Sequence, residues 1–97
     1  MSYADEFPEF TEAQATGIQH AIDDAVDRAH GLSALANAMG VKHYTILTWH
    51  RRARPLPIKR AVQIEVLTGV DRRRFRPHDH RFIWPELEGR VRRFIQR

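Results

Sequence analysis

Residues 32–52 read LSALANAMGVKHYTILTWHRR, and this stretch decides the fold. As one continuous helix it would place Gly40 in the helix interior, which costs about 1 kcal/mol relative to alanine. If the stretch divides at Gly40 instead, the glycine supplies the left-handed residue of a sharp turn. The sequence therefore predicts one helix over 32–39, a turn at Gly40, and a second helix that begins at Lys42 or His43 and runs to the end of the stretch.

The apolar residues within this stretch are spaced as the division requires. The inward positions of both helices and the corner between them are all apolar: Leu35, Ala36, Met39, Val41, Ile46 and Trp49. Residues three or four apart share a helix face, so each helix has one side to bury. Ala36 is small, which allows the second helix to cross close above it. Two helices that meet at a steep angle across a glycine-containing turn form a helix-turn-helix.

The sequence before this motif predicts one longer helix. Thr11 and Gln14 have the spacing of a capping box, in which each side chain satisfies a backbone N–H of the other. An apolar stripe at three- and four-residue steps follows them. This helix is expected to end at His30 and Gly31, with the glycine in the left-handed position. Residues 1–10 are expected to form an acidic flexible arm.

Prolines and glycines set the limits of the elements after the motif. Pro55 and Pro57 exclude a continuous helix between residues 53 and 57. A helix over about 58–68 should follow and stop at the next glycine. Residues 71–85, which carry most of the remaining arginines before the last segment, are expected to form a loop or a short turn of helix.

The last segment, 86–97, has one apolar face and predicts an amphipathic helix. That face consists of Leu87, Val91, Phe94 and Ile95. A short helix is marginal by itself in water, so it should dock on its own bundle or on a partner subunit. We expect it to contribute to a dimer interface. The fold is predicted to be all-α, a compact bundle of about five helices over 11–85 with this helix added at the C-terminus.

The charges divide unevenly along the chain. Residues 1–31 contain seven acidic residues and one arginine, whereas 32–97 contain fifteen lysines and arginines and five acidic residues. The net charge of +4 therefore combines an acidic first third with a strongly basic remainder. Such asymmetry is typical of a face that binds a polyanion. The charge pattern by itself fits a merely solvated basic surface equally well.

Several classes of function are excluded by what the sequence lacks. There is no cysteine, hence no disulfide and no thiolate metal site. The histidines are densest at His78-Asp79-His80 but lack metal-binding spacing, so we interpret that segment as a polar loop without a metal. No phosphate-binding loop, nucleophile elbow or acid pair indicates an enzyme. No signal peptide and no run of about 20 apolar residues is present, so we expect a cytoplasmic protein that does not bind a membrane.

The motif and the residues after it resemble a family of small DNA-binding proteins. The second helix is followed by LPIKRAVQIE at 56–65, Thr-Gly at 68–69 and Arg-Pro at 76–77. This order, together with the helix-turn-helix spacing, is similar to that of Cro-like regulators, which include phage Cro-type repressors and YdaS-like antitoxins. The resemblance covers about 32–77. It implies a lambda-repressor-like bundle that regulates transcription.

The resemblance also bears on the acidic residue nearest the motif. Glu65 is the only acid between residues 32 and 70 and would repel phosphate, so we expect it to turn away from DNA. The family-like spacing implies an ion pair between Glu65 and Arg76. The chain departs from the family where His78 separates a proline from Asp79, and its two ends have no counterpart.

A helix-turn-helix reads the major groove from the N-terminal part of its second helix. The predicted base-reading residues are the solvent-facing residues of that helix: Lys42, His43, Tyr44, Leu47, Thr48 and Arg51. Lys42 or Arg51 can donate to guanine O6 and N7. Thr48 can hydrogen-bond a base edge, and Thr48 or Leu47 can contact a thymine methyl.

Basic side chains around the second helix are predicted to hold phosphates, which positions the protein without reading sequence. These residues are Arg52, Arg54, Lys59 and Arg60. His43 and Tyr44 fit either role, base or phosphate contact. The run Arg72-Arg73-Arg74 either touches DNA or is solvated, and the sequence favours neither.

The sequence therefore predicts a transcriptional regulator that binds a specific double-stranded DNA site as a homodimer, without a cofactor. Two alternatives remain. The chain can be a protein-interaction module, such as an antitoxin or anti-regulator that binds a toxin or another protein. It can also be a nucleoid-type protein that binds DNA without sequence preference.

Overall fold

The structure is a computed structural model that describes residues 10–88, and within this range it is entirely helical. It contains five α-helices and two short 3₁₀ segments, in the order α2 (Glu12–Arg28), α3 (Leu32–Met39), α4 (His43–Arg52), α5 (Ile58–Thr68), η1 (Arg72–Phe75), α6 (His80–Ile83) and η2 (Pro85–Leu87). The predicted all-α fold is confirmed for this part of the chain.

The first helix, α2, begins as the sequence predicts. The Gln14 backbone N–H donates to Thr11 Oγ1 (3.1 Å), and the Thr11 backbone N–H donates to Gln14 Oε1 (2.9 Å). Phe10, which we assigned to the flexible arm, instead packs against the core and meets the His78 ring edge-on with the centroids 5.7 Å apart. An aromatic ring next to a helix start can cover the core, so Phe10 belongs to the packed domain.

The end of α2 differs from the prediction by one residue. The helix stops at Arg28, and His30, not Gly31, has the left-handed φ of 68°. The His30 N–H donates to the Asp27 carbonyl (3.1 Å) and the Gly31 N–H donates to the Val26 carbonyl (2.8 Å). This pair of bonds is the Schellman closure, which requires the left-handed residue immediately after the helix cap. Gly31 also has a positive φ, of 129°, and leads directly into α3.

The helix-turn-helix forms as predicted. Gly40 follows α3 with φ 71° and ψ 31°, and α4 begins three residues later. The Val41 N–H donates to the Ala36 carbonyl (3.0 Å), which closes the turn. Leu35, Ala36 and Ile46 are buried where the two helices meet. The glycine therefore ends one helix and directs the chain into the next.

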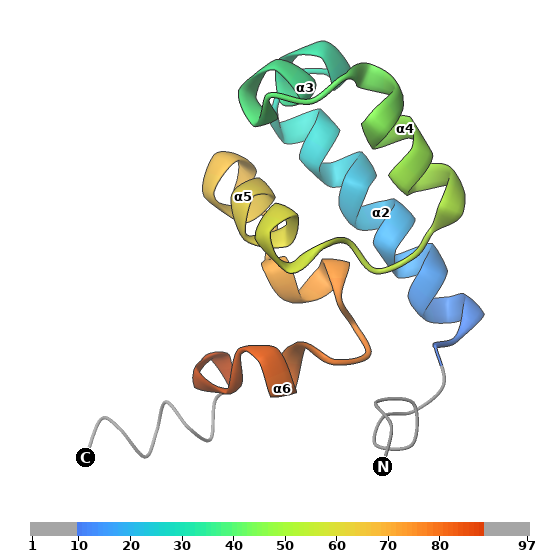
Figure 1. Ribbon diagram of the computed structural model, residues 1–97, viewed down its shortest axis with the longest axis vertical. Coiled ribbons are helices and arrows are strands. Elements are labelled where there is room, and N and C mark those ends of the chain that lie inside the picture. Colours follow the sequence, from blue (N-terminus) through green and yellow to red (C-terminus); the bar gives the residue numbers. More distant parts are fainter. Residues whose placement is uncertain (1–9, 89–97) are drawn as a thin grey trace.

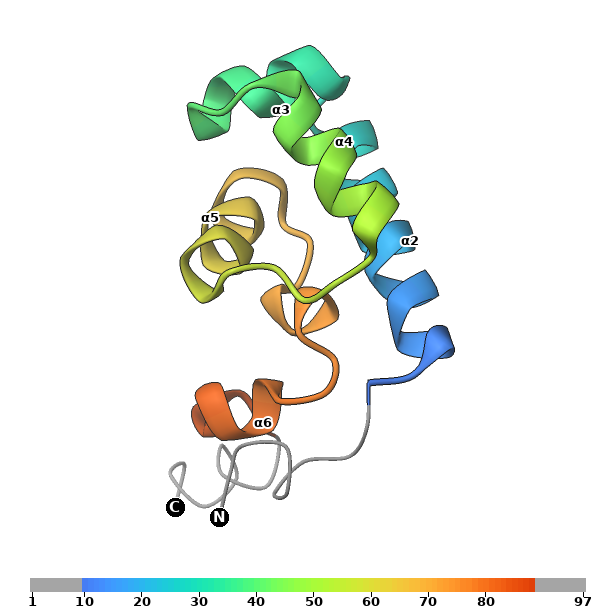
Figure 2. The same cartoon turned by 45° about the vertical axis from the view of Figure 1, so that its right-hand side comes forward.

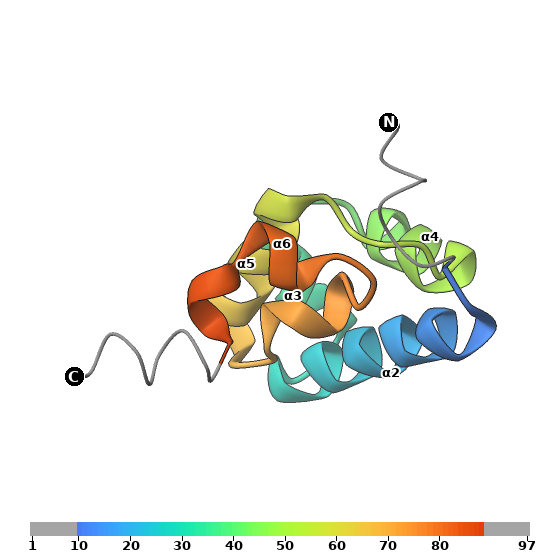
Figure 3. The ribbon, with the colours of Figure 1, turned by 90° about the horizontal axis from the view of Figure 1, so that it is seen from below.

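The helices pack around one shared core. The longest helix, α2, runs beside α4, while α3 closes one end and α6 lies at the other (Figures 1 and 2). η1 packs between α2 and α5, as the view from below shows (Figure 3). The largest buried apolar side chains come from α2, α3, α4, α5, η1 and the segments on either side of α5: Ile18, Leu35, Ile46, Leu56, Ile64, Val70 and Phe75.

The segment between α4 and α5 is extended and fixed at both ends. Ala53 caps α4 in the left-handed conformation (φ 52°), and Pro57 precedes α5. The Leu56 N–H donates to the Phe75 carbonyl (3.2 Å), which holds the middle of the segment on η1. The helix α5 then ends at Gly69 with φ 82°, as predicted.

The predicted ion pair between Glu65 and Arg76 is wrong. Glu65 pairs with Arg72, whose Nη2 lies 2.7 Å from Glu65 Oε1 and whose backbone N–H also donates to the carboxylate (2.9 Å). Arg76 pairs with the buried Asp79 (2.7 Å). The reason is the 3₁₀ turn of η1, which begins at Arg72 and brings its backbone and side chain to α5 together, while Arg76 lies beyond that turn.

The C-terminal part is only partly described. η2 is a 3₁₀ turn, and the predicted interface residues Val91, Phe94 and Ile95 lie outside the described residues. Leu87 packs against the core of its own chain, and its carbonyl accepts a bond from Arg73 Nη1 (3.1 Å). Within residues 10–88, no helix is long and apolar enough to cross a membrane.

Candidate nucleic-acid interface

The helix α4 is buried on one side and open on the other. Ile46 is buried and Trp49 partly buried, as predicted, while Tyr44 is 63% exposed and Leu47 54% exposed. Tyr44, Thr48 and Arg51 are four and three residues apart and therefore share one helical face. This face is the one that a second helix of the motif can offer to a major groove.

The predicted base-reading residues occupy different parts of this open side. Lys42 and His43 are exposed at its N-terminal end, and Arg51 is exposed near its C-terminal end. Leu47 lies toward α2, where it borders an apolar groove with Ile22 and Val26. Thr48 lies on the opposite flank. The six residues are thus spread over the whole exposed surface of α4, and they do not form one cluster.

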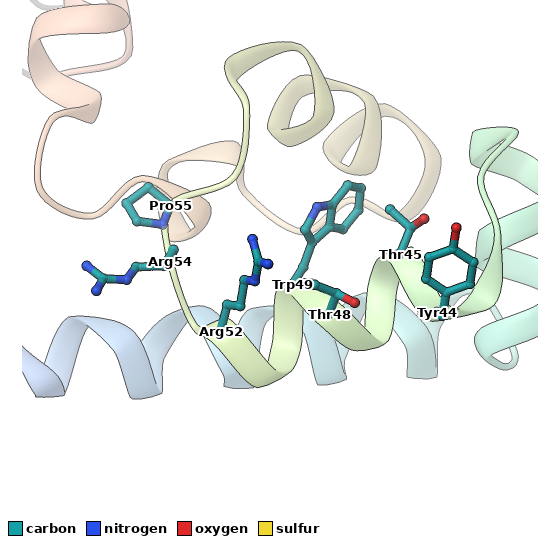
Figure 4. A pocket seen from close by; sticks show the side chains of 7 residues that line it. All are labelled: Tyr44, Thr45, Thr48, Trp49, Arg52, Arg54 and Pro55. Carbon is teal, nitrogen blue, oxygen red and sulfur yellow. The ribbon is translucent and has the colours of Figure 1, made fainter.

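A groove follows the flank of α4 that faces the 54–57 segment. It has a volume of about 300 Å³ and is lined by Tyr44, Thr45, Thr48, Trp49, Arg52, Arg54 and Pro55 (Figure 4). Trp49 and Arg52 project from the same side of α4 in this view. The structure therefore brings two predicted base readers, Tyr44 and Thr48, together with two predicted phosphate binders, Arg52 and Arg54.

The other two predicted phosphate binders are placed differently from each other. Lys59 is exposed at the start of α5. Arg60 is partly buried, and its Nη1 donates to Gln63 Oε1 (2.8 Å) and to the Met39 carbonyl (3.4 Å). Its positive charge lies at the C-terminal end of α3, where a helix dipole favours a cation. Arg60 thus has a structural role that the sequence did not reveal.

The arginines of η1 are engaged within the protein. Arg72 pairs with Glu65 (2.7 Å), Arg73 with Asp71 (2.6 Å) and Arg74 with Asp24 (2.8 Å). The sequence left open whether this run touches DNA or is solvated, and the structure adds that each of its three arginines has an acidic partner in the same chain. These contacts also hold the Glu65 carboxylate against Arg72 at the start of η1.

The cations around α4 have no such partners. Within residues 10–88, no carboxylate lies at ion-pair distance from these five: Lys42, Arg51, Arg52, Arg54 and Lys59. Exposed cations without internal partners are available to bind an external anion. The open side of α4, the adjoining segment and the start of α5 therefore form a surface with unneutralised positive charge, and we call these five residues the free cations.

His50 connects α4 to α2 on the side of α4 that faces α2. Its Nε2 lies 3.1 Å from Asp23 Oδ1, and its carbonyl accepts a bond from Gln19 Nε2 (2.9 Å). The sequence analysis did not single out these residues. The signal was present, because His50 lies four residues after the buried Ile46 and therefore on its side of the helix.

The histidine-rich segment 78–80 is a turn that leads into α6, with His80 as the first residue of that helix. Asp79 is buried and pairs with Arg76, whose Nη1 also donates to the Leu56 carbonyl (2.7 Å). Burial lowers the pKa of His78, although the Asp79 carboxylate acts in the opposite direction. Among residues 10–88, no group of three or more metal-ligating side chains gathers at one place.

Comparison with known families identifies the chain. Residues 22–82 match the family described as bacterial toxin YdaS. This match covers more than half of the 97 residues, and the chain therefore belongs to that family. It confirms the YdaS-like resemblance and spans the helix-turn-helix, α5, η1 and most of α6. No curated protein and no solved structure matches the chain.

Proposed function

We propose that this member of the YdaS family is a transcriptional regulator that binds a specific duplex DNA site by placing α4 in the major groove. The observation that carries the proposal is the distribution of the free cations. They lie on α4, at its start, on the segment that follows it and at the start of α5. The arginines of η1, by contrast, are neutralised by acids of the same chain.

In this proposal the surface has one part that reads bases and another that holds phosphates. Lys42 and Arg51 stand at the two ends of the exposed face, where each can donate to a guanine. Leu47, on the flank near α2, offers an apolar contact for a thymine methyl. Lys59 at the start of α5 holds a phosphate. A single motif reads only a few base pairs, so we propose that two copies bind two half-sites about one helical turn apart.

The test begins with selection of bound duplexes from a random-sequence pool by the full chain. We expect a consensus with two related half-sites. Arg51→Ala should then weaken binding to the consensus by about 1–3 kcal/mol and relax preference at one base position. Arg74→Ala is the matched control, since it removes an arginine that is already paired with Asp24. A pool without any consensus, bound equally well at every sequence, would refute sequence-specific reading and favour nucleoid-type binding.

A protein-binding function is the second candidate, and one feature favours it. An apolar groove of about 220 Å³ lies between α2 and α4, with Leu32, Ile46 and Leu47 in its lining. The family description as a toxin suggests growth inhibition as a readout. If expression of the chain slows growth, comparing Val26→Ser, which changes the α2 side of this groove, with Arg51→Ala separates the candidates. Relief by Arg51→Ala alone supports DNA binding, whereas relief by Val26→Ser alone supports a protein partner.

A further inference from the structure

The groove beside α4 has two walls of different origin. Thr45, Thr48 and Arg52 come from α4, while Arg54 and Pro55 come from the extended segment after it (Figure 4). The partly buried ring of Trp49 lies between these walls. With Tyr44 at one end, a strip of apolar surface is thus bordered by two guanidinium groups and three hydroxyl groups.

The charges of the residues that line this groove indicate the kind of ligand that it can bind. Its lining contains two of the free cations and no acidic residue. The chain has no acid at all between Asp27 and Glu65, and Glu65 is paired with Arg72. An elongated anion with alternating charged and less polar parts therefore fits the groove. A nucleic-acid strand has this composition, because phosphates alternate with sugars along it.

We propose that one sugar–phosphate strand of the bound duplex lies along this groove. The inference rests on the proposed function and adds where the backbone runs. Arg52 and Arg54 bind phosphates, the Thr48 hydroxyl donates to a phosphate oxygen, and the Trp49 ring packs against a deoxyribose. Backbone contacts of this kind fix the register of a protein on DNA without reading its sequence.

The proposal changes the role of one predicted base reader. Thr48 lies on the groove flank, beside Arg52 at the next turn of the helix, so its hydroxyl faces the strand and not the base edges. Arg51 is adjacent to Arg52 in sequence but does not line the groove. The two arginines therefore form a matched pair. Arg52 should act on all sequences alike, and Arg51 should act on sequence preference.

The first measurement is quenching of tryptophan fluorescence by acrylamide in the full chain, with and without a short duplex of arbitrary sequence at low salt. Trp84 is buried, so the accessible signal comes mainly from Trp49, and Trp49→Phe verifies this assignment. We expect saturating duplex to protect Trp49. Inorganic phosphate at the same phosphate concentration should leave it accessible. Protection by phosphate alone would overturn the strand proposal in favour of a small-anion site.

The second measurement locates the strand. Replacing single backbone phosphates of the duplex with neutral methylphosphonates should identify one or two positions that weaken binding about tenfold, the effect of one charged hydrogen bond. That loss should largely disappear in Arg52→Ala and persist in Arg51→Ala. Thr48→Val should weaken all duplexes by a similar factor.

The two proposals fail in different ways. If the duplex binds but Trp49 remains as accessible as in the free protein, the strand does not occupy the groove, while DNA binding itself stands. If Thr48→Val changes base preference, Thr48 is a base reader and the strand proposal is refuted. If no duplex binds even at low salt, the proposed function fails and the strand proposal fails with it.

Discussion

Replacing Gly40 with alanine is expected to destabilise the fold, whereas replacing Gly17 with alanine is expected to stabilise it. A Cβ added at either position meets no heavy atom within 4 Å, so steric crowding does not distinguish them. The backbone does. Gly40 has φ 71°, and Gly17 lies inside α2 without a positive φ.

The magnitudes follow from this difference. A left-handed conformation costs an L-residue about 1–2 kcal/mol, from which about 0.4–1 kcal/mol is recovered because alanine restricts the unfolded chain. Gly40→Ala should therefore lower the free energy of unfolding by about 1 kcal/mol. Gly17→Ala should raise it by about 0.5–1 kcal/mol, the difference between glycine and alanine inside a helix. For a domain of this size, 1 kcal/mol corresponds to roughly 4–8 °C in Tm.

The assay is thermal and urea unfolding of the three proteins followed by circular dichroism. The Tm values should rank Gly17→Ala, the parent chain and Gly40→Ala from highest to lowest. If Gly40→Ala were as stabilising as Gly17→Ala, residue 40 would be helical. The stretch 32–52 would then be one continuous helix, and the chain would contain no helix-turn-helix there.

The remaining predictions concern the loop after η1. Asp79→Ala should destabilise the protein by about 3 kcal/mol in urea unfolding, because it leaves the Arg76 guanidinium without its buried partner. Asp71→Ala, which removes the more exposed pair with Arg73, should cost only about 0–1 kcal/mol, and equal losses would contradict the burial argument. Stability should also fall as the pH drops below about 6.5, because the unfolded chain binds a proton at His78 while burial lowers the pKa of His78 in the folded state. His78→Gln should reduce this fall between pH 7.5 and 5.5, and an unchanged fall would assign it to other groups. The pKa of Asp71 is lowered mainly by its hydrogen bond to Arg73, so its contribution is present at neutral pH and is lost as the pH falls below about 4.

Features set by local sequence could be predicted from it. The helix-turn-helix depends on Gly40 and on apolar residues a few positions away, and all of these lie within one short stretch. The capping box at Thr11 is equally local. Such signals are contained in neighbouring residues, so they do not depend on how distant parts of the chain meet.

Features that depend on distant contacts were missed or misplaced. The partner of Glu65 is decided by where η1 begins, seven residues further on, and spacing alone suggested Arg76. The engagement of Arg60 with the end of α3 likewise requires α5 to be placed first. The sequence also could not separate paired from unpaired arginines, because Asp24 and Arg74 meet only in the folded chain.

The groove beside α4 had no sequence signal of its own. Its second wall exists because Ala53 adopts φ 52° and turns the chain back along the helix. Alanine is not a residue that predicts a left-handed conformation. Four of the residues that line the groove were predicted from the sequence as DNA contacts, namely Tyr44, Thr48, Arg52 and Arg54. Their division between the two walls could be seen only in the structure.

The two hydrogen bonds that the Met39 carbonyl accepts bear on the rate at which the protein should bind a ligand and on the heat-capacity change of binding. It accepts bonds from Gln63 Nε2 (3.2 Å) and Arg60 Nη1 (3.4 Å), so α5 holds the end of α3 from outside the turn. The two helices of the motif therefore reach a ligand already in their relative orientation. Docking of these two helices then needs no coupled folding step within the motif, and their contribution to the heat-capacity change in calorimetry should be limited to the contact surface. Association should proceed at the rate of an orientation-limited rigid encounter, accelerated at low salt by the free cations.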